Sequence, residues 1–216
     1  MPTLSQENYL KAIWHLASEG KVTLQRLASH LDVSPASTLA MVRKLAAANL
    51  ATYHRNSGVR LTAKGRTLAL DVVRRHRLWE LFLTTKLGYR WDEVHRIAEE
   101  LEHINIPDLA DRLDAFLGFP TYDPHGDPIP QRDGTLPPQS KQTLAEQPPG
   151  RYQIVGLKST HETVLAQLAH VKLALGQVVE LRARLPYDGT VVLQIGRRQQ
   201  HLSKQLAEQL LVTPSA

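Results

Sequence analysis

The stretch from Arg75 to His103 most constrains the fold of this chain, because its His and Glu residues recur at helical spacing. His76 and Glu80 are four residues apart. Four further residues follow at positions i, i+4, i+7 and i+8, namely His95, Glu99, Glu102 and His103. A helix places residues at these intervals on one face. Two facing helices of this kind would direct six nitrogen and oxygen ligands into one crevice, so the stretch predicts a divalent-metal site.

The residue types in this stretch limit the chemistry of the site. The chain has no Cys, which excludes disulfides, zinc fingers and thiolate catalysis. Imidazole and carboxylate ligands suit Mn, Fe, Zn, Ni or Co better than a soft ion. A single His–Glu pair on a helix is most often a solvated pair, but two pairs with a Glu-His step on one face are much less ordinary. The spacing therefore favours metal binding over solvated ion pairs.

The positive charge of the chain lies in its first third. Residues 1–72 hold nine Lys or Arg and four acids, and nine against four gives +5. The remaining residues hold 17 of each sign, so the whole formal charge of +5 comes from the first third. So modest an excess could arise by chance or because this part of the chain binds a polyanion, and the helix pattern described next decides between these two explanations. A basic first third is expected where that part faces a polyanion.

The first third also carries the helix signals of a helix-turn-helix. Thr3 and Gln6 fit a capping box that opens a first helix. A short second helix, LQRLASHL, follows. Ser34 is a good N-cap, and Pro35 stands at the first position of a third helix, where its missing N–H costs nothing. Two short helices with a tight turn between them predict a helix-turn-helix.

Two short strands follow the third helix and predict a wing. Leu50–Tyr53 and Val59–Leu61 are joined by a polar turn, which is typical of a hairpin. Hydroxyl groups can meet phosphates or base edges, whereas cations mainly contact the DNA backbone. The residues expected to contact DNA are Ser34, Pro35, Ala36, Ser37, Thr38, Arg43, Lys44, Arg55 and Arg60. A helix-turn-helix used only for protein contact is the alternative, and the local charge disfavours it.

The remainder of the chain divides by composition. A helical pattern runs without a linker from Thr62 to Leu87, further helical segments follow, and residues 119–150 are rich in Pro and Gly. Short strands with one helix come next, and a last helix is expected at HLSKQLAEQLLV. We therefore predict a mainly α (α+β) chain. Its expected parts are a winged helix-turn-helix over 1–72, a helical dimerisation and metal-binding domain over 73–138, a linker over 139–150 and a small β-barrel over 151–216.

The apolar runs and the first residues bear on localisation. No apolar run approaches the ~18 residues needed to cross a bilayer. Met1 is not followed by a basic and then apolar signal. The sequence therefore predicts a soluble, cytoplasmic protein.

Six segments together resemble one family. They are NYLKAIWHLASEG, SPASTLAMVRKLA, GVRLTAKG, RHRLWELFL, EVHRIAEELEH and DPHGDPIP. Over roughly residues 5–130 the chain looks like a member of the diphtheria-toxin-repressor family of metal-dependent transcriptional regulators. Its third part is similar, more weakly, to the SH3-like (FeoA-like) domain of the longer members. The resemblance implies a homodimeric repressor with a winged helix, a dimerisation and metal domain, and an accessory barrel.

The resemblance also implies two metal sites. The positions of one match His76, Glu80 and His95, and the SH3-like domain sometimes completes it, at positions that fall around His161 and then Glu162. The second site in the family is built from a first-helix residue and three from the later helix. In this chain those positions are Asn8, Glu99, Glu102 and His103. Iron-type members carry Cys at the position of Glu99, and manganese-type members carry an acid.

Two positions depart from the pattern of the family. Asn8 stands where iron-type members carry Met and manganese-type members carry Asp, so its amide oxygen would be a neutral, weaker ligand. Lys11 stands where the manganese type has another carboxylate, and an ammonium cannot bind a metal.

The function that we expect is that of a metal-dependent repressor and not of an enzyme. Glu99 in a chain without Cys favours Mn(II), with Fe(II) second and Zn, Co, Ni or Cd as substitutes. The expected partners are double-stranded DNA with a palindromic operator near metal-homeostasis genes, and a second copy of the chain. Two alternatives are a metal-independent winged-helix regulator and a metallohydrolase. The hydrolase needs a substrate pocket and a spare general base, and would leave the basic head unexplained.

Overall fold

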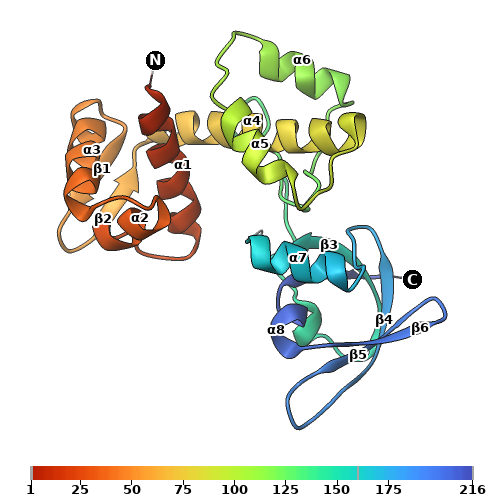
Figure 1. Cartoon of the computed structure of the whole chain (residues 1–216). Helices are drawn as coiled ribbons and strands as arrows, with labels where there is room; N and C mark the ends of the chain where they lie inside the picture. The colour runs from red at the N-terminus through yellow and green to blue at the C-terminus, as the bar shows by residue number, and fades with distance from the viewer. Residues whose placement is uncertain (1, 160, 216) are drawn as a thin grey trace. The chain divides into compact units, whose positions relative to one another are not determined.

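The structure is a computed structural model that describes residues 2–159 and 161–215. The chain divides into two compact units, which are described one at a time. The first comprises Met1–Trp79, Ala98–Phe116 and Pro130–Leu136. The second comprises Glu80–Ile97, Leu117–Ile129 and Pro137–Ala216. Figure 1 shows the course of the chain and the labels of its elements.

The first unit begins with the winged helix-turn-helix that the sequence predicts. Its elements are α1 (Leu4–Ser18), α2 (Leu24–His30), α3 (Pro35–Ala47), β1 (Ala51–His54) and β2 (Gly58–Leu61). The capping box is present, because the Gln6 backbone N donates to Thr3 Oγ1 and the Thr3 N donates to Gln6 Oε1. Ser34 caps α3, with Pro35 in its first turn. Apolar side chains of α1, α2 and α3 form one core, and the largest buried ones are Leu10, Ile13, Leu27 and Leu45.

The wing is a tight hairpin that is attached to the loop before α2. Strands β1 and β2 pair antiparallel from Ala51↔Leu61 to His54↔Gly58. The Val59 N donates to the Val22 O at 2.9 Å. Gly58 has a positive φ of 79°, and a Cβ at this position would collide with the Val22 O. Only glycine therefore allows the wing to approach this loop so closely.

Three helices follow the wing: α4 (Ala63–Leu87), α5 (Val94–Leu101) and α6 (Leu109–Phe116). The long α4 confirms the helical pattern that runs on from the wing without a linker. The helix expected to carry both Glu102 and His103 instead ends at Leu101. Two contacts explain this earlier end, because the Ile104 N donates to the Leu101 O in a tighter turn and Arg75 Nε donates to the Glu102 O.

The second unit contains a five-stranded antiparallel sheet with the order β6-β5-β4-β3-β7, of which Figure 1 labels β3 to β6. Its elements are η1 (Leu144–Glu146), β3 (Gly150–Leu157), α7 (Glu162–His170), β4 (Val178–Arg184), β5 (Val191–Ile195), β6 (Arg198–Leu202), α8 (Lys204–Ala207) and β7 (Leu210–Pro214). The core consists of buried side chains from the sheet and α7, among them Ile154, Leu165, Leu181 and Leu193.

Two segments of this unit differ from the sequence predictions. The last helix was wrong for most of its length, because α8 is short and Leu210–Pro214 forms β7 beside β3. This pairing is distant in sequence, and it overrides the local helix preference of the segment. The stretch expected to be a plain linker includes η1, and its Leu144 is fully buried in the core of the sheet.

The loop DPHGDPIP is well fixed within the second unit. Asp123 Oδ1 accepts hydrogen bonds from the backbone N–H groups of His125 and Asp127, at 2.8 and 2.9 Å. The Leu157 N of β3 donates to the His125 O at 3.1 Å. Gly126 has a φ of 81°, and a Cβ there would collide with the Val155 O. The backbone of the loop therefore packs directly on β3.

Among the described residues, no helix combines the length and the apolar character that crossing a bilayer requires.

Candidate metal centre

A first group of polar side chains lies where α1, α4 and the end of α5 meet. We call it the Glu102 cluster, and it comprises Glu7, Asn8, Lys11, Arg75, His76, Glu99, Glu102 and His103. On α1, Lys11 lies four positions after Glu7 and three after Asn8, and residues at these spacings are neighbours on the surface of a helix. Arg75 and His76 come from α4. All members belong to the first unit.

Glu102 is the centre of this cluster and is fully buried. Its Oε2 accepts a hydrogen bond from Lys11 Nζ at 2.6 Å and lies 2.5 Å from His76 Nδ1. Its backbone O accepts from Arg75 Nε at 2.5 Å. A carboxylate buried this deeply needs cations or hydrogen-bond donors, because its desolvation is costly.

Glu7 is a member that sequence reasoning missed. Its side chain is buried, its Oε1 accepts from Arg75 Nη2 at 2.9 Å, and its Oε2 lies 2.7 Å from His103 Nδ1. Arg75 also forms an ion pair with Asp71, one turn earlier on α4. The only sequence signal was an acid four positions before Lys11 on the first helix, which is a common surface pattern.

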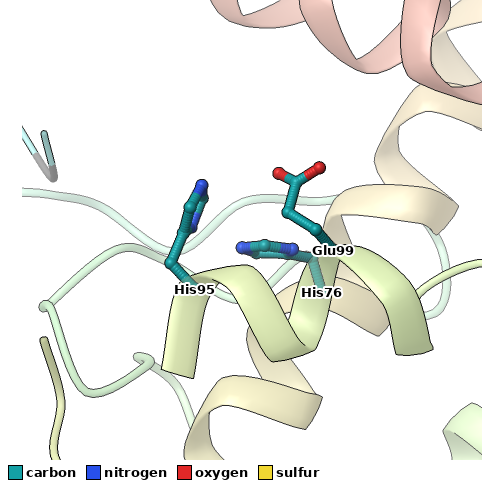
Figure 2. A group of neighbouring side chains, drawn as sticks. All are labelled: His76, His95 and Glu99. Atoms are coloured by element: carbon teal, nitrogen blue, oxygen red, sulfur yellow. The ribbon is translucent and has the colours of Figure 1, made fainter. Parts of the chain in front are cut away.

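Glu99 and His95 lie one turn apart on α5, and Figure 2 shows both rising from the same side of this helix. The ring of His76, from α4, lies beside Glu99 in the same view (Figure 2), and ligand atoms of the two residues lie within 4.8 Å. Glu99 Oε1 also accepts from Lys11 Nζ at 2.8 Å. The structure therefore brings His76 together with Glu99 and Glu102.

A second group lies within the second unit, and we call it the His125 cluster: Glu80, His95, Asp123 and His125. Glu80 Oε1 lies 3.1 Å from His95 Nδ1, and Glu80 Oε2 lies 3.5 Å from His125 Nδ1. Ligand atoms of Glu80, Asp123 and His125 all lie within 4.8 Å of one another, and these three residues are buried. The pairing of Glu80 with His95 matches the predicted site, whereas Asp123 and His125 were not predicted.

Hydrogen bonding fixes the orientation of the His125 ring. Its Nε2 lies 2.7 Å from the Trp91 backbone O, so Nε2 carries a proton and donates it. This leaves Nδ1 toward Glu80 and Asp123. A metal-binding imidazole commonly donates its other N–H to a carbonyl in this way.

The charge of His125 is set by the same neighbours. Burial alone would lower the pKa of His125, but the hydrogen bond and charge of Glu80, together with the charge of Asp123, raise it to about 9. The imidazole therefore carries a positive charge near neutral pH in the metal-free protein. Because a metal ligand must be the neutral imidazole, metal binding here has to displace a proton.

Buried oxygens test whether the Glu102 cluster suits a cation. Among the residues that the structure describes, Asn8 Oδ1 and Glu102 Oε1 are buried and accept no hydrogen bond. An unsatisfied buried acceptor costs free energy, so buried polar atoms are normally paired. Glu102 Oε1 lies 3.7 Å from His103 Nε2. Amide and carboxylate oxygens together with imidazole nitrogens are ligands that suit divalent ions of intermediate hardness. The residues therefore fit a divalent metal.

The resemblance pointed to His161 and Glu162 of the accessory domain as further metal ligands. His161 is exposed and caps α7, where its Nδ1 accepts from the Thr163 backbone N at 3.3 Å. The side chain of Glu162 lies outside the described part of the structure. His161 thus has a local structural role at the beginning of α7.

Most of the predicted DNA contacts lie on the surface of the winged head. The exposed ones are Ser34, Pro35, Ala36, Ser37, Arg43, Lys44, Arg55 and Arg60. The prediction that Thr38 contacts DNA was wrong, because its side chain is fully buried and its Oγ1 donates to the Ser34 O at 3.1 Å. Thr38 therefore stabilises the start of α3 and does not reach a ligand outside the protein.

The winged head, the two clusters and the small sheet define a class, namely winged-helix proteins with clustered imidazole and carboxylate side chains on the helices and loop that follow the head. Three family models match in order. They are described as iron dependent repressor, N-terminal DNA binding domain (residues 1–59), iron dependent repressor, metal binding and dimerisation domain (62–131), and FeoA domain (142–214). The chain belongs to the diphtheria-toxin-repressor family of metal-dependent transcriptional repressors.

Three similar proteins give the range of the likeness. The diphtheria toxin repressor of Corynebacterium jeikeium is 30% identical over 183 residues, or 83% of this chain and 76% of that protein. The iron-dependent repressor IdeR of Mycobacterium bovis is 38% identical over 125 residues, which is 57% of this chain and only 54%, about half, of that relative. A solved structure of a manganese-dependent transcriptional repressor in complex with manganese is 36% identical, with a TM-score of 0.84, over 97% of this chain and 100% of that chain.

Proposed function

We propose that this protein is a homodimeric, metal-dependent transcriptional repressor that binds double-stranded DNA through its winged head. The observation that carries the proposal is the Glu102 cluster, where buried oxygens of Asn8 and Glu102 accept no hydrogen bond from any residue that the structure describes. A divalent cation would supply the positive charge that these oxygens lack. The exposed Arg and Lys residues of α3 and of the wing support the DNA-binding part of the proposal.

The metal-holding residues that we propose fall into two sets. In the Glu102 cluster they are Asn8, Glu99, Glu102 and His103, with His76 beside Glu99. In the His125 cluster they are Glu80, His95, Asp123 and His125, and these include two residues of the DPHGDPIP loop. The first set is the proposed switch, because Asn8 belongs to α1 and α1 contributes Leu10 and Ile13 to the core of the head.

The mechanism that we propose acts through the position of α1. Side chains of α1 that meet Glu102 and His103 restrain the helix at one end of the head. In a dimer, this restraint would fix two heads at the spacing of the half-sites of a palindromic operator. The metal then favours one arrangement, and its differential affinity for that arrangement sets the size of the response. This function requires binding and no catalysis.

The choice of metal follows from the ligand types. Carboxylate, amide and imidazole groups without thiolate favour Mn(II), with Fe(II) second and Zn, Co, Ni or Cd as substitutes. The names of the relatives point to both metals, since IdeR is called iron-dependent and the solved repressor manganese-dependent. The genes that we propose this repressor controls are metal-homeostasis genes, and its proposed location is the cytoplasm.

A gel-shift experiment with purified protein tests the proposal. The DNA is a palindromic promoter fragment, and the conditions are EDTA against added Mn(II) or Fe(II). We expect tight binding only with metal, and E102Q should lose this response because a neutral amide replaces the central carboxylate. The matched control is E100Q, because Glu100 is exposed near the end of α5, two residues before Glu102. Equal binding of the wild type in EDTA and in metal would refute the proposal.

A further inference from the structure

The Lys11 side chain reaches into the Glu102 cluster. Its Nζ donates to Glu99 Oε1 at 2.8 Å and to Glu102 Oε2 at 2.6 Å, and lies 3.3 Å from His76 Nδ1. The side chain is only 19% exposed. Two carboxylates and one imidazole nitrogen therefore surround a single ammonium, and these are the groups that would surround a metal ion.

The charges of the cluster show what this ammonium does. Within the cluster, three carboxylates, those of Glu7, Glu99 and Glu102, face two permanent cations, Lys11 and Arg75, and Arg75 also pairs with Asp71 outside the cluster. With neutral imidazoles the sum is −1. A Gln at position 11 would make it −2 and a Glu would make it −3. Each cation that enters a buried acidic cluster must be balanced by carboxylate charge, so the number of metal ions depends on this sum.

The two carboxylate oxygens of Glu102 differ in their hydrogen-bond partners. Oε2 accepts from Lys11 and lies against His76, whereas Oε1 accepts no hydrogen bond among the described residues. His103 Nε2 lies 3.7 Å from this free Oε1. The Lys11 ammonium therefore balances the charge at Oε2 of Glu102, and Oε1 remains available to a second cation.

We propose that Lys11 is a built-in cation that fills one of two cation positions in the Glu102 cluster. The cluster then takes one divalent ion, on the side of Glu102 Oε1, and not two. This inference rests on the proposed metal-dependent function and specifies its stoichiometry. Lys11 is a positioning residue, because it acts on the carboxylates and does not itself hold the metal.

A second consequence concerns the metal-free protein. Lys11 joins α1 to Glu99 of α5 and to Glu102 in the turn that follows, and these contacts form without any metal. The Lys11–Glu102 contact is buried, with side chains 19% and 0% exposed, so solvent screens it less than a surface ion pair, whereas the Glu99 side chain is 41% exposed. The attachment of α1 therefore persists in part without metal, and metal binding completes an attachment that already exists.

The experiment compares the wild type with K11E and K11Q. Exposed Lys64, near the start of α4, provides the matched controls K64E and K64Q. Bound Mn(II) per chain is measured by equilibrium dialysis and elemental analysis at saturating Mn(II), without DNA. We expect K11E to bind one more Mn(II) per chain than the wild type, and K64E to bind the same number. An equal number for K11E and the wild type overturns the proposal.

The melting temperature in EDTA provides a second readout that needs no metal. K11Q should melt several degrees below the wild type, since two carboxylates lose their cation, and K64Q should melt with the wild type. Equal melting of K11Q and the wild type overturns the proposal as well, and K11Q decides the matter if K11E does not fold. A wild type whose DNA binding ignores metal refutes the proposed function separately, because neither readout on Lys11 involves DNA.

Discussion

Glu7 Oε2 lies 2.7 Å from His103 Nδ1, which joins the first turn of α1 to the turn that follows α5. The other oxygen of Glu7 accepts from Arg75 Nη2, so one buried carboxylate holds residues of three segments together. These segments are distant in sequence. The helix α1 therefore contributes Leu10 and Ile13 to the core of the head and Glu7 to the Glu102 cluster.

Replacement of Glu7 should therefore destabilise the metal-free protein. In E7Q the buried guanidinium of Arg75 loses a charged partner, and breaking a buried pair costs about 3 kcal/mol. The measurement is urea unfolding in EDTA. E19Q is the control, because Glu19 pairs with Arg26 on the surface and its loss should cost less than about 1 kcal/mol. Equal losses in E7Q and E19Q would contradict a buried structural role for Glu7.

The raised pKa of His125 predicts a pH dependence of stability in the metal-free protein. The folded value of about 9 lies above the ordinary value of 6.5, so the stabilisation is full below pH 6.5 and is lost as the pH rises through 9. The shift corresponds to about 3 kcal/mol. Urea unfolding of the wild type and H125Q at pH 6, 7.5 and 9 should show a difference that shrinks with pH. A difference that does not change with pH would rule out this charge on His125.

The glycine of the DPHGDPIP loop should control the His125 cluster. A Cβ on Gly126 would collide with the Val155 O, and the positive φ adds strain. G126A should therefore displace the loop from β3, lower stability by about 2 kcal/mol or more, and weaken Mn(II) binding at Glu80 and His125. G118A is the control, since Gly118 has a similar φ in open space and should cost only about 1 kcal/mol. Equal Mn(II) binding by both variants would contradict the proposed role of the loop.

Local signals made the winged head predictable. The capping box of Thr3 and Gln6 and the Ser34-Pro35 helix start are encoded within a few residues, and both are present in the structure. The same holds for the hairpin, whose turn ends at Gly58. Thr38 was assigned to the outside because helix position alone does not reveal that its hydroxyl is covered by Tyr9.

The parts that depend on distant contacts were less predictable. The His and Glu residues of α4 and α5 were found by their helical spacing, but the division into two clusters depends on Lys11 and on the loop with Asp123 and His125. A loop has no periodicity from which ligands can be recognised. Strand β7 was missed for a similar reason, because its partner β3 lies about 60 residues earlier.

In the proposed mechanism metal binding and DNA binding are coupled, and thermodynamic linkage between the two tests this coupling most directly. If metal strengthens DNA binding by some factor, then DNA must strengthen metal binding by the same factor. The measurement is the Mn(II) affinity of the wild type with and without a saturating palindromic promoter fragment, with E102Q as the uncoupled reference. We expect DNA to raise the Mn(II) affinity of the wild type at least about fivefold and to leave that of E102Q unchanged. Equal Mn(II) affinities of the wild type with and without DNA would contradict the account.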